Sequence, residues 1–190
     1  MPRVVSGTLY HVPASPILGD AVLPLAEVQR TYPDQAAHAR HASYPQVLAQ
    51  PVHPLGCTWA DVVFLSPVHP APLFAALRRS GRAVRDPEVW ALPAGRLDPA
   101  RTTIMLMRAG STGHRADAAD VDDYLPFTTA SLRAVDQITL EAVQRLESLQ
   151  PGDPWLPWVD VPHVLHRGCI PLAWFDASQP RLASPGIVRE

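Results

Sequence analysis

Short apolar runs that end at proline or glycine predict the strands of this chain. Thr8 to Val12, Thr-Leu-Tyr-His-Val, is aromatic and β-branched and stops at Pro13, which is typical of a short strand. Residues 61–66, Asp-Val-Val-Phe-Leu-Ser, are more continuously apolar and indicate a buried strand. By the same criteria, further strands are expected over residues 88–92, 102–107 and 164–166.

Three stretches carry helical patterns. Residues 71–80 are rich in Ala, Leu and Arg and are followed by a glycine, which predicts one helix with a glycine stop. Residues 129–149 place apolar side chains close to a period of 3.6 and predict the longest helix of the chain. Residues 25–49 indicate short helices broken at Pro33 and Pro45.

Strands near both ends with helices between them favour an α+β fold over a regular alternation of strand and helix. A length of 190 residues fits one domain, 1–190, in which residues 177–190 are expected to form a tail. Residues 110–123 are polar and acidic and predict an exposed loop. The 22 prolines are spread along the chain, so they shorten elements and do not form a low-complexity tract.

Composition excludes several classes of protein. The 47% apolar content and mean hydropathy of −0.01 are those of ordinary globular proteins, and no apolar run approaches the roughly 20 residues that span a bilayer. The first residues lack a signal-peptide pattern, so we expect a cytoplasmic protein without membrane partners. A net charge of −2 disfavours non-specific nucleic-acid binding. Cys57 and Cys169 are expected to be free thiols.

The sequence contains none of the compact motifs that identify common enzyme classes. It has no Gly-x-Ser-x-Gly elbow and no glycine-rich phosphate loop. His163 and His166 have a His-x-x-His spacing, but zinc normally needs three or four ligands and no cysteine or acidic cluster accompanies the pair. We therefore predict no metal site, with a metal hydrolase built from His11, His163 and His166 as the weakest alternative.

Three pieces of the chain, in this order, resemble ADP-ribosyltransferase-like proteins. They are Leu-Tyr-His-Val at residues 9–12, the predicted strand and helix over residues 62–77, and residues 164–175 with their Arg-Gly-Cys-Ile-Pro. The resemblance implies two split sheets with flanking helices and NAD as the ligand. In that superfamily an aromatic–histidine pair ends the first strand and its imidazole holds the adenosine ribose, which assigns this position to Tyr10 and His11.

The second family element is a strand, a small polar residue and a helix that bears an aromatic ring. By resemblance, Phe64 and Phe74 would wall the nicotinamide side and Ser66 would be the small polar residue. Phe64 and Phe74 lack the hydroxyl of the family's rings, although stacking needs only the face of the ring. Arg167 would contact a pyrophosphate or would be a solvated turn residue.

The third family element is a glutamate before an Ile-Pro or Val-Pro pair, and here that place is taken by His163. The glutamate stabilises a developing oxocarbenium ion, which a neutral imidazole does poorly. The resemblance therefore implies a divergent protein that binds NAD or a related nucleotide and transfers ADP-ribose to an unidentified acceptor, with His163 and His11 as catalytic residues. The alternative is a catalytically silent nucleotide-binding or protein-interaction module.

Taken singly, each of these residues also fits an ordinary structural role, as a strand end, a core ring or a histidine bonded to backbone. The functional interpretation depends on His11 and His163 meeting at the rim of one pocket lined by phenyl rings.

Overall fold

The computed structural model describes residues 4–13, 18–34, 45–107, 119–150, 152–153, 158 and 160–176. Over these ranges the protein mixes helices with antiparallel sheets, which confirms the α+β prediction. The expected tail over residues 177–190 lies outside the described residues, as do residues 110–118 of the expected loop and residues 35–44 of the first helical stretch.

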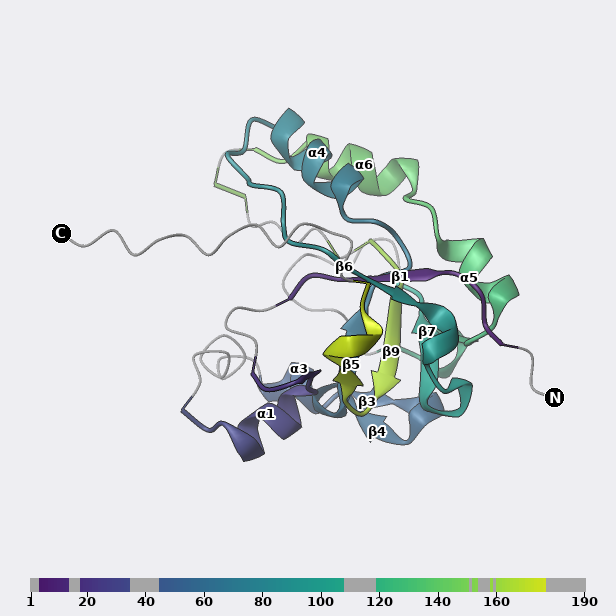
Figure 1. Ribbon diagram of the computed structural model, residues 1–190. Coiled ribbons are helices and arrows are strands. Elements are labelled where there is room, and N and C mark those ends of the chain that lie inside the picture. The colour runs from purple at the N-terminus through teal and green to yellow at the C-terminus, as the bar shows by residue number, and fades with distance from the viewer. Residues whose placement is uncertain are drawn as a thin grey trace.

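A four-stranded antiparallel sheet forms the centre of the molecule (Figure 1). Its strands, in spatial order, are β5 (Val62–Leu65), β9 (His163–Arg167), β7 (Thr102–Met105) and β8 (Tyr124–Pro126). The expected strands over residues 61–66, 102–107 and 164–166 are thus confirmed, with bounds shifted by a residue or two. The innermost strands carry runs of buried apolar residues, as expected for strands covered on both faces.

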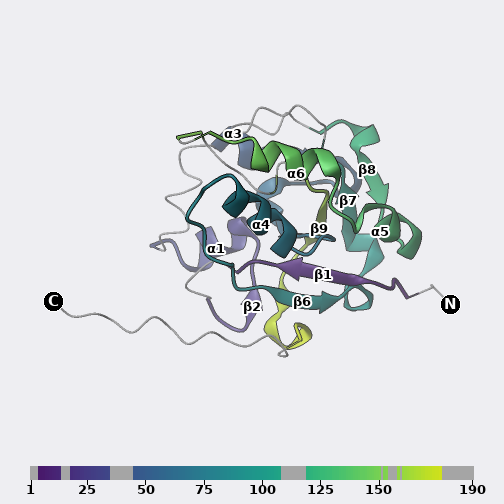
Figure 2. The same ribbon diagram turned by 90° about the horizontal axis from the view of Figure 1, so that it is seen from above.

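Strand β1 (Thr8–His11) pairs antiparallel with β6 (Trp90–Pro93), and the two run side by side in both views (Figures 1 and 2). This ribbon is joined to the central sheet by backbone hydrogen bonds at the end of β5. The backbone groups of Tyr10 and Ser66 exchange two hydrogen bonds, each 2.8 Å long. The N-terminal strand is therefore held against the end of β5.

Smaller elements complete the fold. Two-residue pairs join β2 (Ala21–Val22) to β10 (Ile170–Pro171) and β3 (Pro51–Val52) to β4 (Cys57–Thr58). The α-helices are α1 (Leu25–Thr31), α3 (Pro45–Leu48), α4 (Ala71–Arg79), α5 (Thr129–Val135) and α6 (Leu140–Glu147). Single 3₁₀ turns are η1 (His53–Leu55), η2 (Trp59–Asp61), η3 (Ala94–Arg96), η4 (Pro99–Arg101), η5 (Val121–Asp123) and η6 (Leu172–Trp174).

The prediction of one long helix over residues 129–149 is wrong, because α5 ends at Val135 and α6 begins at Leu140. Thr139 has an extended backbone, and its Oγ1 accepts a hydrogen bond from the backbone N–H of Ala142. A threonine cap starts a new helix at that point, although the apolar period continues across the break. Of the short helices expected over residues 25–49, α1 ends before Pro33 and α3 begins at Pro45, a position that suits a residue without an N–H.

The expected exposed loop over residues 110–123 is also corrected at its end. Residues 121–123 form η5, and Asp123 is buried with 8% of its surface exposed. The carboxylate of Asp123 accepts a hydrogen bond of 2.8 Å from the backbone N–H of Asp120. A carboxylate in this position closes a capping box, which explains an acidic residue in a buried turn.

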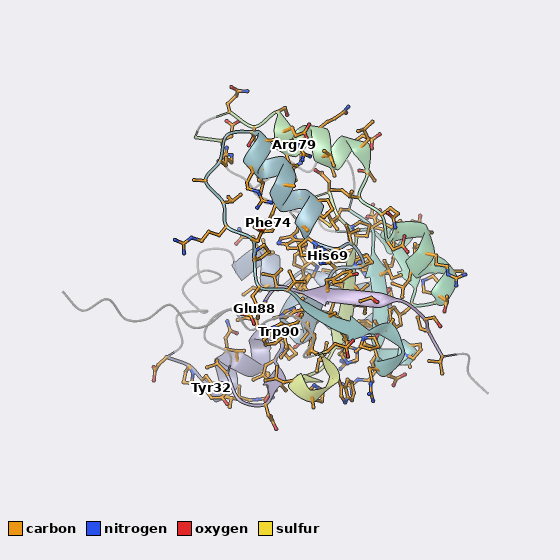
Figure 3. All side chains as sticks on the ribbon, turned by 45° about the horizontal axis from the view of Figure 1, so that its top comes forward. Tyr32, His69, Phe74, Arg79, Glu88 and Trp90 are labelled. Atoms are coloured by element: carbon orange, nitrogen blue, oxygen red, sulfur yellow. The ribbon has the colours of Figure 1, made fainter. Side chains whose placement is uncertain are left out.

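Helices α4 and α6 lie side by side and cover one side of the molecule (Figures 1 and 2). Leu73 and Leu77 of α4 and Leu146 of α6 are fully buried in a core cluster of their own. Arg79, which is labelled in Figure 3, forms an ion pair with Glu147 at the end of this helix pair. Among the residues that the structure describes, no helix has the length and apolar character needed to cross a bilayer.

The central sheet separates two further core clusters. On β9, Val164 belongs to the cluster that also holds Leu9 and Leu92 of the β1–β6 ribbon. The next residue, Leu165, belongs to the cluster on the other face, together with Val62. This alternation is the two-residue period of a strand and decides which side of the sheet each functional candidate faces.

Candidate functional site

Phe64 lies between the two histidines to which the sequence assigned function. Nδ1 of His11 is 3.1 Å from the carbonyl oxygen of Phe64. On the side-chain side, the phenyl ring of Phe64 meets the imidazole of His163 edge to face, with ring centroids 5.7 Å apart. We call these three residues the histidine–phenylalanine site. It joins the end of β1, the middle of β5 and the start of β9.

The hydrogen bond to Phe64 fixes the protonation pattern of His11. A carbonyl oxygen can only accept, so Nδ1 must carry the proton and donate. Burial lowers the pKa of His11, against a smaller opposing effect of this backbone bond. In the resulting neutral ring, Nε2 is an acceptor, which is the group that would receive a hydrogen bond from a ligand hydroxyl.

Two aromatic side chains surround the imidazole of His11. Trp90, its register partner on β6, has its ring centroid 6.2 Å away, and Phe175 lies at 6.1 Å. Trp90 and Phe175 are themselves 5.4 Å apart, and the indole Nε1 of Trp90 donates to Glu88 at 2.9 Å (Figure 3). The result is an aromatic corner around one neutral imidazole.

His163 is partly buried and has no hydrogen-bond partner among the described residues. Burial lowers its pKa to about 4, so the ring is neutral near pH 7. Its aromatic neighbour Phe64 also contacts Trp59, with centroids 5.1 Å apart. Neither ring nitrogen of His163 is among the fully buried polar atoms that lack a partner within the described residues, so both can reach solvent or a ligand.

The structure links His11 and His163 through Phe64, and no hydrogen bond or ring contact within the described residues joins the two imidazoles directly. His163 shares its face of β9 with Leu165, in the cluster against which Phe64 packs. His11 instead touches Phe175, which packs against the cluster on the other face. The two rings therefore approach Phe64 from different sides. The described residues do not show both imidazoles at the rim of one shared pocket, and the cavity lined by Thr8, Tyr10 and His69 is bordered by neither of them.

Tyr10 and Ser66 are close together, but their side chains have different surroundings. Their backbones pair, as described above. The hydroxyl of Ser66 is buried, donates to the carbonyl of Val68 at 2.8 Å and accepts from the N–H of Val68 at 3.1 Å, so its proton is not available to a ligand. The ring of Tyr10 packs edge to face against His69, with centroids 4.7 Å apart, on the opposite side of β1 from His11.

Phe74 and Arg167 have partners other than Phe64, although Arg167 is only two residues from Leu165, the register partner of Phe64 on β9. Phe74 is buried in the cluster between α4 and α6, so the structure does not pack it with Phe64. Arg167, at the end of β9, donates from Nη1 to the carbonyl oxygen of Leu55 at 3.1 Å. Its positive charge also contributes to lowering the pKa of Asp61, which is set mainly by hydrogen bonds from Thr58. Both residues have structural roles in this arrangement.

The geometry of β9 disfavours the metal alternative. His163 and His166 lie on a strand and not on a helix, so an offset of three residues turns the two rings to opposite faces. Nδ1 of His166 is 2.9 Å from Oγ1 of Thr102, and burial lowers its pKa to about 4. Within the described ranges, no three His, Cys, Asp or Glu residues are grouped so that they could hold a metal ion.

Sequence reasoning missed the aromatic residues around the two histidines, which are Trp59, Trp90 and Phe175. One signal was available for Trp90: it falls in a predicted strand next to Leu92, at the spacing that puts both on one face. Trp59 and Phe175 come from 3₁₀ turns or their ends, and no local pattern places them beside β1 and β5.

Comparisons with known proteins return no match for this chain: no protein-family model, no curated protein and no solved structure is similar to it.

Proposed function

We propose that this protein binds NAD or a related nucleotide at the histidine–phenylalanine site, as a divergent ADP-ribosyltransferase-like protein. One observation carries the proposal: Phe64 contacts His11 through its carbonyl oxygen and His163 through its ring. Two residues that the sequence resemblance assigns to the two ends of NAD, far apart in the chain, thus share Phe64 as a neighbour.

The chemistry of the site suits a nucleotide. Nε2 of His11 offers an acceptor for a ribose hydroxyl, because Nδ1 is already used on Phe64. The rings of Trp90 and Phe175 beside it offer apolar faces for a base or a sugar. His163 offers two unpaired nitrogens, one donor and one acceptor in the neutral ring.

Binding without cleavage is the form of this function that the geometry supports best. Breaking the nicotinamide bond develops positive charge on the ribose, and a carboxylate would stabilise that charge. His163 has a pKa of about 4, so near pH 7 it is neutral and supplies no negative charge. The silent nucleotide-binding module is therefore favoured over the active transferase.

Isothermal titration calorimetry with NAD tests the binding step. We expect wild-type protein to bind NAD, and His11→Ala to weaken binding about tenfold, the effect of losing one hydrogen bond of about 1.4 kcal/mol. His53→Ala is the matched control, because His53 is an exposed histidine in η1 outside the site. Absence of NAD binding, or equal affinity of His11→Ala and wild type, would overturn the proposal.

A nicotinamide-release assay tests the chemical step. Wild type is expected to release no nicotinamide above the His11→Ala background. His163→Glu would restore the family's carboxylate, and we expect it to release nicotinamide if the surrounding geometry is that of the family. Release by wild type would show that the protein is an active transferase and not a silent module.

A further inference from the structure

A separate cavity lies on the other side of β1 from His11. Its volume is about 440 Å³, within the range of small-molecule sites. Its walls come from three parts of the chain: residues 6–8 with Tyr10, residues 67–69 after β5 with Pro72 in the first turn of α4, and residues 132–133 and 136–138 at the end of α5 and beyond it. Figure 3 shows His69, one of the lining residues, between α4 and β1.

The wall formed by the loop after β5 is held in place by its own hydrogen bonds. The Ser66 hydroxyl closes a turn with both backbone groups of Val68. The backbone N–H of Ala71 then donates to Nδ1 of His69 at 3.1 Å. Since Nδ1 accepts, the proton of a neutral His69 is on Nε2, which leaves a hydrogen-bond donor on a ring that lines the cavity.

Arg133 supplies an unpaired positive charge at this cavity. It lies on the last turns of α5, lines the cavity and has neither an ion pair nor a hydrogen bond within the described part of the chain. Asp136, three residues later, is not within ion-pair distance of it, and Oδ1 of Asp136 instead accepts from Nε2 of Gln137 at 3.1 Å. A guanidinium with free N–H groups favours an oxyanion, which it binds through two parallel hydrogen bonds.

Residues that carry hydroxyl groups also line the cavity. Ser6, Thr8 and Tyr10 all contribute to the cavity surface. A hydroxyl both donates and accepts, so this surface matches a ligand that carries hydroxyl groups as well as a charged end. The cavity as a whole thus combines the Arg133 guanidinium, the carboxylate of Asp136, an imidazole donor and three hydroxyl-bearing residues.

From these features we propose that the cavity binds a small hydroxylated oxyanion, whose phosphate or carboxylate contacts Arg133 and the Nε2–H of His69. The ligand's hydroxyl groups face Thr8 and Tyr10. This site does not depend on the proposed NAD site, because Tyr10 and His11 are successive residues of a strand and point to opposite sides of β1.

The test uses three probes of similar size: glycerol 3-phosphate, glycerate and uncharged glycerol, titrated calorimetrically at low ionic strength. We expect at least one of the two anions to bind, and glycerol to show no binding. Comparison of the two affinities shows whether the site prefers a phosphate or a carboxylate group. If neither anion binds, or if glycerol binds as tightly, the proposal fails.

Variants locate the binding. Arg133→Gln is expected to weaken the anion about tenfold, the effect of losing a charge-assisted pair. Arg96→Gln serves as the matched control, since Arg96 is an exposed arginine in η3 that does not line the cavity. Undiminished affinity in Arg133→Gln would place the anion elsewhere and overturn the proposal.

A substitution of Asp136 tests whether the ligand is a pure anion or also carries a cationic group. Removing its negative charge with Asp136→Asn should strengthen binding of a pure anion, because a repulsive charge is lost. Weaker binding in Asp136→Asn would show that the ligand needs a cationic group and would contradict the proposed ligand class. His11→Ala should leave the anion's affinity unchanged, and competition between NAD and the anion would refute two separate sites.

Discussion

Nδ1 of His11 lies 3.1 Å from the carbonyl oxygen of Phe64, immediately beyond the pair of backbone bonds between Tyr10 and Ser66. A side chain thus continues the contact between β1 and β5 where the backbone ladder stops. The same hydrogen bond both holds the N-terminal strand and selects the tautomer of the imidazole. Structure and proposed function therefore share one interaction.

Because His11 both holds β1 against β5 and faces the proposed ligand, His11→Ala should affect stability as well as NAD binding. Besides weakening NAD binding, the variant leaves the partly buried carbonyl oxygen of Phe64 without its partner, which costs about 1 kcal/mol of stability. Urea unfolding monitored by circular dichroism measures this loss. His53→Ala, at an exposed position, should unfold at the wild-type midpoint. A His11→Ala protein as stable as wild type would show that the hydrogen bond contributes nothing.

Stability should fall on mild acidification because of His166. Burial, together with the nearby Arg101 guanidinium, lowers the pKa of His166 from 6.5 to about 4. Between these values the unfolded chain binds more protons than the folded one, so the contribution is complete above pH 6.5 and is lost as pH falls toward 4. A pKa shift of this size corresponds to a loss on the order of 3 kcal/mol in the free energy of unfolding. The lowered pKa of His163 acts in the same direction.

Urea unfolding at pH 7.5, 5.5 and 4.5 measures this dependence. The replacement His166→Gln removes the titrating ring, keeps a polar side chain near Thr102 and should flatten the profile over this range. An unchanged slope in this variant would mean that other groups cause the acid sensitivity.

The break between α5 and α6 makes Thr139 a stability determinant. Its Oγ1 accepts the N–H of Ala142 at 3.2 Å, so Thr139→Ala is expected to cost about 1 kcal/mol. Thr139→Ser keeps the capping oxygen and should retain most of the stability. Chemical denaturation of the three proteins measures the difference, and equal losses in the alanine and serine variants would contradict a capping role.

Two glycines with positive φ should differ in their tolerance of alanine. Gly56 has a φ of +57° and open space where a Cβ would stand, so Gly56→Ala should cost about 1 kcal/mol. Gly168 has a φ of +115°, and its Cβ would meet the guanidinium of Arg101. We expect Gly168→Ala to lose roughly 1 kcal/mol more than Gly56→Ala, measured by thermal unfolding. The reverse order would show that Arg101 moves away freely.

Elements with a local apolar pattern and a local stop signal were predicted well. The strand β5 follows from a continuous apolar run before Pro67, and helix α4 ends where Ser80 and Gly81 follow it. Both signals are contained in about ten successive residues. The joined prediction over residues 129–149 failed because the apolar period is the same on both sides of Thr139, and periodicity alone does not show a cap.

The sequence by itself determined strands β1, β5, β6, β7 and β9 and helix α4, because these depend on neighbours along the chain, and its resemblance to a family singled out His11 and His163. Only the tertiary structure decided that Phe64 contacts both imidazoles, that Phe74 packs elsewhere, and that Arg133 opens onto a cavity with His69. Such contacts depend on strand pairing and helix packing between distant segments. One residue of register reverses the face that a strand side chain occupies, and no local pattern contains that information.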